Sequence, residues 1–236
     1  MVNINLHRLH LTQLLKAIYG DAELSNYLGF KGGTALMFFY DLPRFSVDLD
    51  FDLLDNAHTE KVHEKIHQLV QNQGDIIDEA QKHYGIIVVM DYGKTERKLK
   101  IEIFNRNFGS RYELKDLFGF TVKVMRIEDM FAHKLCALTD RSVLTNRDIF
   151  DLWFLMDKKT AINRKIVETR MNLSLENQFE KALHLLESKK NLHLLDGLGD
   201  LMDAELKLFV KTKLRSEIMS LLQFYHQFPI TDLSAK

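Results

Sequence analysis

The chain has 236 residues, 46% of them hydrophobic, which is enough for one large domain or two small ones with ordinary apolar cores. The 32 Lys and Arg residues nearly balance the 33 Asp and Glu residues, so a nucleic-acid partner would need a local basic patch. The single cysteine, Cys136, excludes an intramolecular disulfide and disfavours a cysteine-based zinc site. Without a signal peptide or an apolar run of about 18 residues, we expect a soluble, cytoplasmic protein with no membrane partner.

The first half of the chain mixes helical and strand patterns. Residues 1–30 carry apolar side chains near a 3.6-residue period, which predicts helix. The pair Gly32 and Gly33 then precedes the apolar stretch 34–40, which predicts a short helix ending before Pro43. Residues 46–54 alternate between apolar and acidic side chains, which predicts a half-buried strand. A polar helix is predicted over 58–73, and strands over 86–90, 97–104 and 121–125.

From residue 128 onward the period is helical. Helices are predicted over 128–138, 146–156, 162–170, 176–187 and 204–224. The predicted fold class is therefore mixed, α+β or α/β, with a small mixed sheet and packed helices in residues 1–126. Residues 127–236 are predicted to form a helical C-terminal domain.

Two aspartates on the predicted strand suggest a metal site. Asp48 and Asp50 lie two residues apart, so their carboxylates point the same way and converge. Adjacent carboxylates repel each other unless a cation lies between them, and Mg²⁺ typically binds one or two carboxylates plus substrate phosphates. Taken alone, this pattern is equally well explained by a strand with an acidic solvent face.

The glycine pair suggests a phosphate site. Gly32 and Gly33 lie at the predicted start of a helix, where free backbone N–H groups and the helix dipole favour an anion. Glycine also lacks the Cβ that would keep a phosphate away from the backbone. A plain turn would explain the glycines alone. A phosphate site followed by a metal-binding strand occurs by chance less often than either motif alone.

The run KGGTALMFFYDLPRFSVDLDF, residues 31–51, resembles the first motif of the AbiEii/AbiGii toxin-type nucleotidyltransferases, a branch of the polymerase-β-like superfamily. In that superfamily a G-G or G-S turn opens a helix and the next strand carries D-x-D. The longer pattern R-x-S-x-D-L-D-F is characteristic of the branch. It is matched by Arg44, Ser46, Asp48, Leu49, Asp50 and Phe51.

The resemblance continues into the next strand. KLKIEIF, residues 98–104, resembles the strand on which the superfamily often places a third carboxylate, which is Glu102 in this chain. Glu102 shares a strand face with Lys98 and Lys100, so it either meets the metal or pairs with a lysine.

Two helical motifs complete the resemblance. IEDMFAHKLCALTDR, residues 127–141, resembles a motif with a functional lysine at Lys134, and NRDIFDL, residues 146–152, resembles one with acids at Asp148 and Asp151. The residues alone favour an exposed or snorkelling lysine at Lys134. They are also consistent with a helix-start acid at Asp148 and with salt bridges from these acids to Arg141 or Arg147. The C-terminal third, from about residue 158, matches no motif.

The resemblance implies transfer of a nucleoside monophosphate from an NTP to an acceptor, with release of pyrophosphate and with Mg²⁺ or Mn²⁺ as cofactor. It also implies a nucleotidyltransferase fold whose helical domain completes the active-site cleft. The predicted catalytic residues are Asp48, Asp50, Glu102, Lys134 and Asp148, and the metal ligands are Asp48, Asp50 and Glu102. The predicted nucleotide-binding residues are Lys31, Gly32, Gly33, Thr34, Arg44, Ser46, Lys134 and Asp151.

The family further implies the toxin of a toxin–antitoxin pair, with tRNA as acceptor and a cognate antitoxin as partner. The donor is left open among ATP, GTP, CTP and UTP. A protein-nucleotidylating enzyme and a non-catalytic nucleotide-binding or interaction module remain alternatives.

The basic and aromatic stretch 94–111 either helps to hold an RNA backbone or is a solvated strand face. The ten histidines are expected to be solvated side chains rather than metal ligands.

Overall fold

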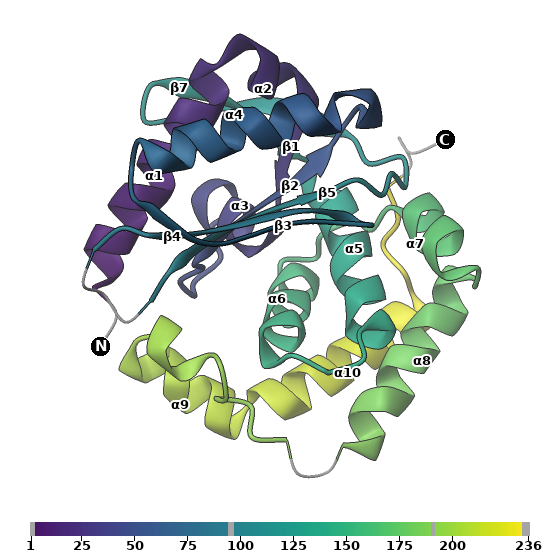
Figure 1. Cartoon of the computed structure of the whole chain (residues 1–236). Helices are drawn as coiled ribbons and strands as arrows, with labels where there is room; N and C mark the ends of the chain where they lie inside the picture. The colour runs from purple at the N-terminus through teal and green to yellow at the C-terminus, as the bar shows by residue number, and fades with distance from the viewer. Residues whose placement is uncertain (1–2, 94–96, 190–191, 233–236) are drawn as a thin grey trace. The chain divides into compact units, whose positions relative to one another are not determined.

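The computed structural model describes residues 3–93, 97–189 and 192–232. The chain divides into two compact units, Met1–Asn107 with Arg111–Met125, and Phe108–Ser110 with Arg126–Lys236. In the described residues, the first unit combines strands with helices and the second consists mainly of helices (Figure 1). The predicted mixed α+β fold class is therefore confirmed.

The described strands of the first unit form one seven-stranded sheet, in the order β3-β4-β5-β2-β1-β7-β6. Strand β2 lies at its centre, antiparallel to β1 and parallel to β5. β1 and β7 are also parallel, whereas β3/β4, β4/β5 and β6/β7 are antiparallel. The strands are β1 (Leu28–Lys31), β2 (Asp48–Leu53), β3 (Asp75–Lys82), β4 (Gly85–Asp91), β5 (Leu99–Phe104), β6 (Tyr112–Leu117) and β7 (Phe120–Met125).

Helices cover one face of this sheet. In Figure 1, α1 and α4 lie along the same side of the strands. Their fully buried apolar residues, such as Leu14 of α1 and Ile66 of α4, belong to the same core as Leu49 and Phe51 of β2. Because strand side chains alternate, Asp48 and Asp50 project to the opposite face. The helices of the first unit are α1 (Ile4–Gly20), α2 (Ala22–Tyr27), α3 (Gly32–Phe39) and α4 (Thr59–Gln71), with a short 3₁₀ turn at Asn56–His58.

The second unit packs its helices around aromatic side chains. Phe131, Phe150, Phe179 and Tyr225 are all buried, and the Tyr225 hydroxyl donates to the carbonyl of Thr160 at 3.1 Å. No helix in the described residues of either unit is long and apolar enough to cross a bilayer. The elements are α5 (Ile127–Asp140), α6 (Asn146–Asp157), α7 (Arg164–Met171), α8 (Leu175–Ser188), a 3₁₀ turn at Gly199–Leu201, α9 (Ala204–Thr212) and α10 (Leu214–Gln227).

Three sequence predictions of secondary structure are wrong. Residues 28–31 form β1 rather than the end of a helix, because pairing with β2 and β7 overrides the local period. Strands β3 and β6 were not predicted, since they are edge strands with largely exposed side chains and no apolar alternation. The single helix predicted over 204–224 is two helices, which break at Lys213 (φ −125°, ψ −35°).

Candidate active site

The glycine pair forms the first turn of α3, directly after β1, as the sequence predicted. The N–H groups of a first helical turn have no acceptor within the helix, so they are available to an anion. Gly32 has φ +82°, a conformation that residues with side chains rarely adopt. A Cβ at this position would lie 2.3 Å from Oδ2 of Asp50. The turn and the carboxylate are therefore in direct contact, and only glycine leaves room for both.

The second glycine accommodates two polar side chains. A Cβ on Gly33 would lie 2.8 Å from Nη2 of Arg44 and 2.8 Å from Oγ of Ser46. Both side chains belong to buried residues, and Nη1 of Arg44 donates to the carbonyl of Phe45 at 3.0 Å. The structure thus brings together the two glycines and both polar residues of the R-x-S-x-D-L-D-F pattern.

Thr34 ties the helix to the acidic strand. Its side chain is fully buried, and its Oγ1 donates to the backbone carbonyl of Asp48 at 2.5 Å. This hydrogen bond fixes α3 against the first residue of β2. The hydroxyl therefore contacts the strand and positions the Asp48 backbone relative to the glycine turn.

The acidic face of β2 continues onto β5. The register of these parallel strands places Asp48 opposite Lys100 and Asp50 opposite Glu102. Nζ of Lys100 lies 3.1 Å from Oε2 of Glu102. Burial lowers the pKa of Lys100, but the carboxylates of Asp48, Glu102 and Asp50 more than offset this and raise the pKa above its ordinary value. Of the two alternatives for Glu102, pairing with a lysine is the one seen in the structure.

Lys31 and Asp52 extend the same face. Nζ of Lys31 lies 2.5 Å from Oδ1 of Asp52 and 4.2 Å above the ring of Phe104. The Tyr112 hydroxyl donates to the other oxygen of Asp52 at 2.6 Å. Sequence reasoning missed the roles of Asp52 and Tyr112. The third acid of the D-L-D-F-D alternation was a visible signal, whereas Tyr112 lies on an edge strand that the pattern did not reveal.

A buried ion-pair cluster in the second unit joins α5 to α6. Nζ of Lys134 lies 3.0 Å from Oδ1 of Asp148 and 2.7 Å from Oδ2 of Asp151. The Lys134 side chain is 15% exposed, so the alternative of an exposed lysine is wrong. Asp148 also accepts from Thr145 Oγ1 at 2.7 Å and pairs with Arg141 at 3.3 Å. The structure therefore brings the three predicted residues of this unit together.

The charges of this cluster shift the pKa of Asp148. Burial raises the pKa of its carboxyl, but the charges of Lys134 and Arg141 and the hydrogen bond from Thr145 outweigh burial and lower the pKa to about 2. Asp148 is thus ionised at neutral pH, and its charge holds the Lys134 ammonium in place.

The first unit's site fits a hard divalent cation in its chemistry. Its donors are carboxylate oxygens, which Mg²⁺ and Mn²⁺ prefer as ligands. Within residues 3–93, 97–189 and 192–232, no group of three or more His, Cys, Asp and Glu side chains is arranged to hold a metal. Asp48 and Asp50 would therefore hold the ion together with substrate phosphates, and a direct metal contact for Glu102 stays a prediction.

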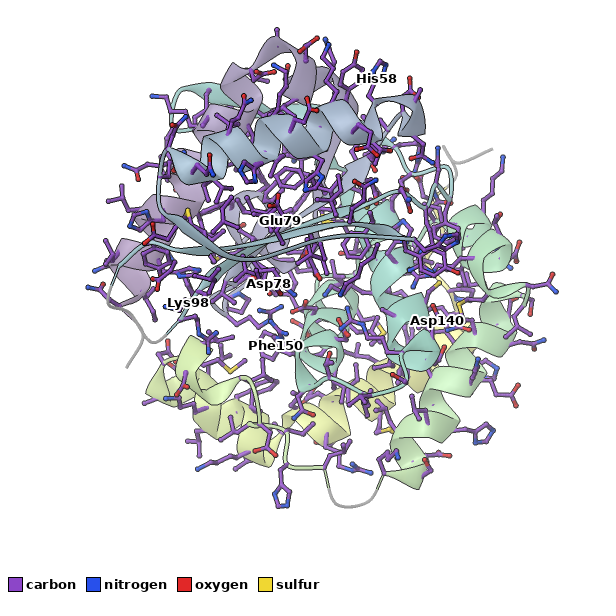
Figure 2. All side chains as sticks on the ribbon, in the orientation of Figure 1. His58, Asp78, Glu79, Lys98, Asp140 and Phe150 are labelled. Atoms are coloured by element: carbon purple, nitrogen blue, oxygen red, sulfur yellow. The ribbon has the colours of Figure 1, made fainter. Side chains whose placement is uncertain are left out.

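The prediction that the histidines are solvated is wrong for His63 and His67 of α4 and for the buried His7. Residues 63–67, HEKIH, do have the H-E-x-x-H spacing that is found in zinc enzymes. In the structure His63 and His67 of α4 both contact Glu79 of β3, at 2.8 and 2.9 Å, so they are partly buried hydrogen-bond partners of this carboxylate rather than solvated. Glu79 lies on the α4 side of the sheet (Figure 2). Together the three residues attach the edge strand to the helix.

Comparisons with known proteins find chains of similar fold. Two solved structures have a similar fold: JHP933 from Helicobacter pylori, and a protein described as "putative nucleotidyltransferase from H. pylori". JHP933 is 23% identical with a TM-score of 0.57, over 96% of this chain and 93% of that chain. The second is 23% identical with a TM-score of 0.58, over 96% of both chains. No curated protein matches the chain.

A family model decides the assignment. The model described as "Nucleotidyl transferase AbiEii toxin, Type IV TA system" matches residues 13–224, which include every predicted site residue of both units. The resemblance inferred from the motifs is thereby confirmed. The chain belongs to the AbiEii nucleotidyl transferase toxin family of type IV toxin–antitoxin systems and is an enzyme of the nucleotidyltransferase class.

Proposed function

We propose that the protein transfers a nucleoside monophosphate from an NTP to tRNA, with Mg²⁺ or Mn²⁺ as cofactor, and acts as a toxin restrained by a cognate antitoxin. The contact between the Gly32 turn and the Asp50 carboxylate carries this proposal. It joins an anion-binding helix start to an acidic strand, the two parts that transfer from a nucleoside triphosphate requires.

In the first unit, the backbone N–H groups of Gly32 and Gly33 bind the β- and γ-phosphates. Arg44 and Ser46 pack against Gly33 and brace the turn from behind. Asp48 and Asp50 hold the divalent cation, which when bound stabilises the attacking and leaving oxygens at the α-phosphate.

Glu102 and Lys31 have supporting roles in this proposal. Glu102 lies opposite Asp50 and accepts the proton of the attacking hydroxyl, which requires its ion pair with Lys100 to open. Lys31 pairs with Asp52, so it contributes positive charge beside the phosphate site while fixing the end of β1.

In the second unit, Lys134 has a nucleotide-binding role in this proposal, because its ammonium can act as a point charge toward a phosphate. Asp148 and Asp151 are buried and hold its ammonium from two sides, which restricts the lysine to one orientation. Asp151 is fully buried, so we assign it to positioning Lys134 rather than to touching the nucleotide.

The RNA acceptor is supported by basic and aromatic side chains between residues 84 and 111. The guanidinium of Arg106 lies 4.9 Å from the ring centroid of Tyr84, whose side chain is exposed. A positive charge and an exposed aromatic ring therefore lie side by side, as in proteins that bind single-stranded nucleic acid. Lys98 of the same stretch pairs with Asp91, and Lys94 lies outside the described residues.

The proposal is tested by incubating the full chain with Mg²⁺, total tRNA and each α-³²P-labelled NTP in turn. We expect RNase-sensitive label with one preferred nucleotide. The double variant Asp48→Ala with Asp50→Ala is expected to abolish labelling. The control double variant, Asp75→Ala with Asp78→Ala, removes two exposed acids of β3 and should leave labelling unchanged. Label removed by protease would indicate a protein acceptor instead. Full activity of the Asp48/Asp50 double variant would overturn the catalytic assignment.

A further inference from the structure

A lysine lies among the carboxylates that the proposed metal needs. Lys100 is the residue of β5 directly opposite Asp48, and its ammonium is 3.1 Å from Glu102. Its side chain is 35% exposed, so the charge is neither deeply buried nor freely solvated. Asp48, Glu102 and Asp50 all interact electrostatically with Lys100. One ammonium thus neutralises part of a three-carboxylate face.

This placement follows from the strand geometry. In the sequence KLKIEIF, Lys98, Lys100 and Glu102 share one strand face, and the parallel register with β2 brings the last two beside the D-x-D pair. Lys98 lies beyond the paired residues of β2 and makes its ion pair with Asp91. Of these two lysines on the same face, Lys100 is the one that interacts with the proposed metal ligands.

A divalent cation and Lys100 cannot both neutralise the same carboxylates without repelling each other. We propose that Lys100 is a built-in counter-cation that competes with the divalent metal for the carboxylates of Asp48, Asp50 and Glu102 and so weakens metal binding before nucleotide arrives. The inference rests on the proposed function of this site.

Two consequences follow for the reaction. In the metal-free site, the Lys100 ammonium reduces the mutual repulsion of the three carboxylates before substrate binds. Opening of the Lys100–Glu102 ion pair would make the Glu102 carboxylate available to bind a metal or to accept a proton. Lys100 therefore couples metal binding to the release of Glu102.

The test measures Mn²⁺ binding to the full chain without nucleotide, by the electron paramagnetic resonance signal of free Mn²⁺. Lys100→Met is expected to bind Mn²⁺ about tenfold more tightly than wild type, because a competing positive charge is gone. Lys100→Gln removes the charge but keeps a hydrogen-bond donor for Glu102, and should show the same tightening. Lys100→Arg keeps the charge and should bind as wild type does.

The control is Lys98→Met, which removes the same charge from the same strand face but from the ion pair with Asp91. It should leave Mn²⁺ affinity within about twofold, since a solvent-screened charge farther away has little effect. The inference would be overturned if Lys100→Met and Lys100→Gln both bind Mn²⁺ with wild-type affinity, or if Lys98→Met tightens binding as much as they do. Either result would leave the proposed function of the site untouched. The double variant Asp48→Ala with Asp50→Ala should lose Mn²⁺ binding. If it binds Mn²⁺ as well as wild type and Lys100→Met do, or if none of the three binds Mn²⁺, the proposed metal site fails as well.

Discussion

Gly32 and Asp50 are in such close contact that a single methyl group at Gly32 would lie 2.3 Å from the carboxylate oxygen. Gly32 follows β1 directly and opens α3, and Asp50 lies opposite Lys31 on the paired strand β2. The contact links the anion-binding turn to the acidic strand. Changes at either residue should therefore affect the other.

Gly32→Ala should abolish nucleotidyl transfer while leaving the protein folded. The substitution imposes a strained positive φ, which costs about 1–3 kcal/mol, and also displaces the Asp50 carboxylate. The matched control is Gly119→Ala, because Gly119 has φ +85° but nothing within 4 Å of its Cβ position. Both variants should lose similar stability in urea unfolding, and only the first should lose activity. Equal activity in the two variants would refute the importance of the Asp50 contact.

Lys134→Met should destabilise the second unit strongly. It leaves Asp148 and Asp151 buried without the ammonium that lies between them, a loss worth about 3–5 kcal/mol. Equilibrium urea unfolding followed by circular dichroism measures the change. Lys165→Met, at an exposed position on α7, should change the free energy of unfolding by less than about 0.5 kcal/mol. A similarly small effect for Lys134→Met would show that the cluster does not hold α5 to α6.

Asp148→Asn should change how stability depends on pH. The folded-state pKa of Asp148 is about 2 against an ordinary 3.8, so its charge stabilises the fold above pH 3.8 and this contribution is lost as pH falls toward 2. The difference in the free energy of unfolding between wild type and variant should be constant from about pH 7 to 5 and shrink between about pH 4 and 2.

Urea unfolding at a series of pH values measures this difference. The control, Asp200→Asn, removes an exposed carboxylate of the same unit and should change the free energy of unfolding by less than about 0.5 kcal/mol. If the difference in the free energy of unfolding between wild type and Asp148→Asn stays constant down to pH 2, the charges of Lys134 and Arg141 do not lower the pKa of this carboxyl as assigned.

His7→Phe should lower both stability and activity. His7 is fully buried, with Nε2 2.9 Å from the carbonyl of Val47 and Nδ1 2.5 Å from the Tyr92 hydroxyl. Since Nε2 donates to the carbonyl, the Tyr92 hydroxyl must donate to Nδ1. The ring of phenylalanine fills the space but leaves the carbonyl next to Asp48 without its donor, at a cost of about 1–3 kcal/mol.

Thermal unfolding and the labelling assay measure the two effects of His7→Phe. Tyr92→Phe is the graded comparison, because it removes one hydrogen bond to His7 and leaves the Val47 contact in place. It should reduce stability less than His7→Phe and keep activity. If Tyr92→Phe loses as much activity as His7→Phe, the Val47 contact is not what positions Asp48.

The local features of the site follow from the sequence alone. Alternation in residues 46–54 placed Asp48 and Asp50 on one face, the glycine pair marked the start of α3, and the motifs identified the family. These features are recoverable because strand and helix periods, and the conformational freedom of glycine, act within a few residues. The predicted helices over 128–138, 146–156, 162–170 and 176–187 followed for the same reason.

The contacts between residues far apart in the chain come from the tertiary structure. The parallel register of β2 and β5 put Lys100 among the carboxylates, and the packing of α5 on α6 gave Lys134 its two acidic partners. Strands β1, β3 and β6 also escaped prediction, since a short or edge strand is stabilised by its neighbours rather than by its own pattern. Register and pairing depend on contacts between residues far apart in the chain, and a periodicity within one segment carries no information about them.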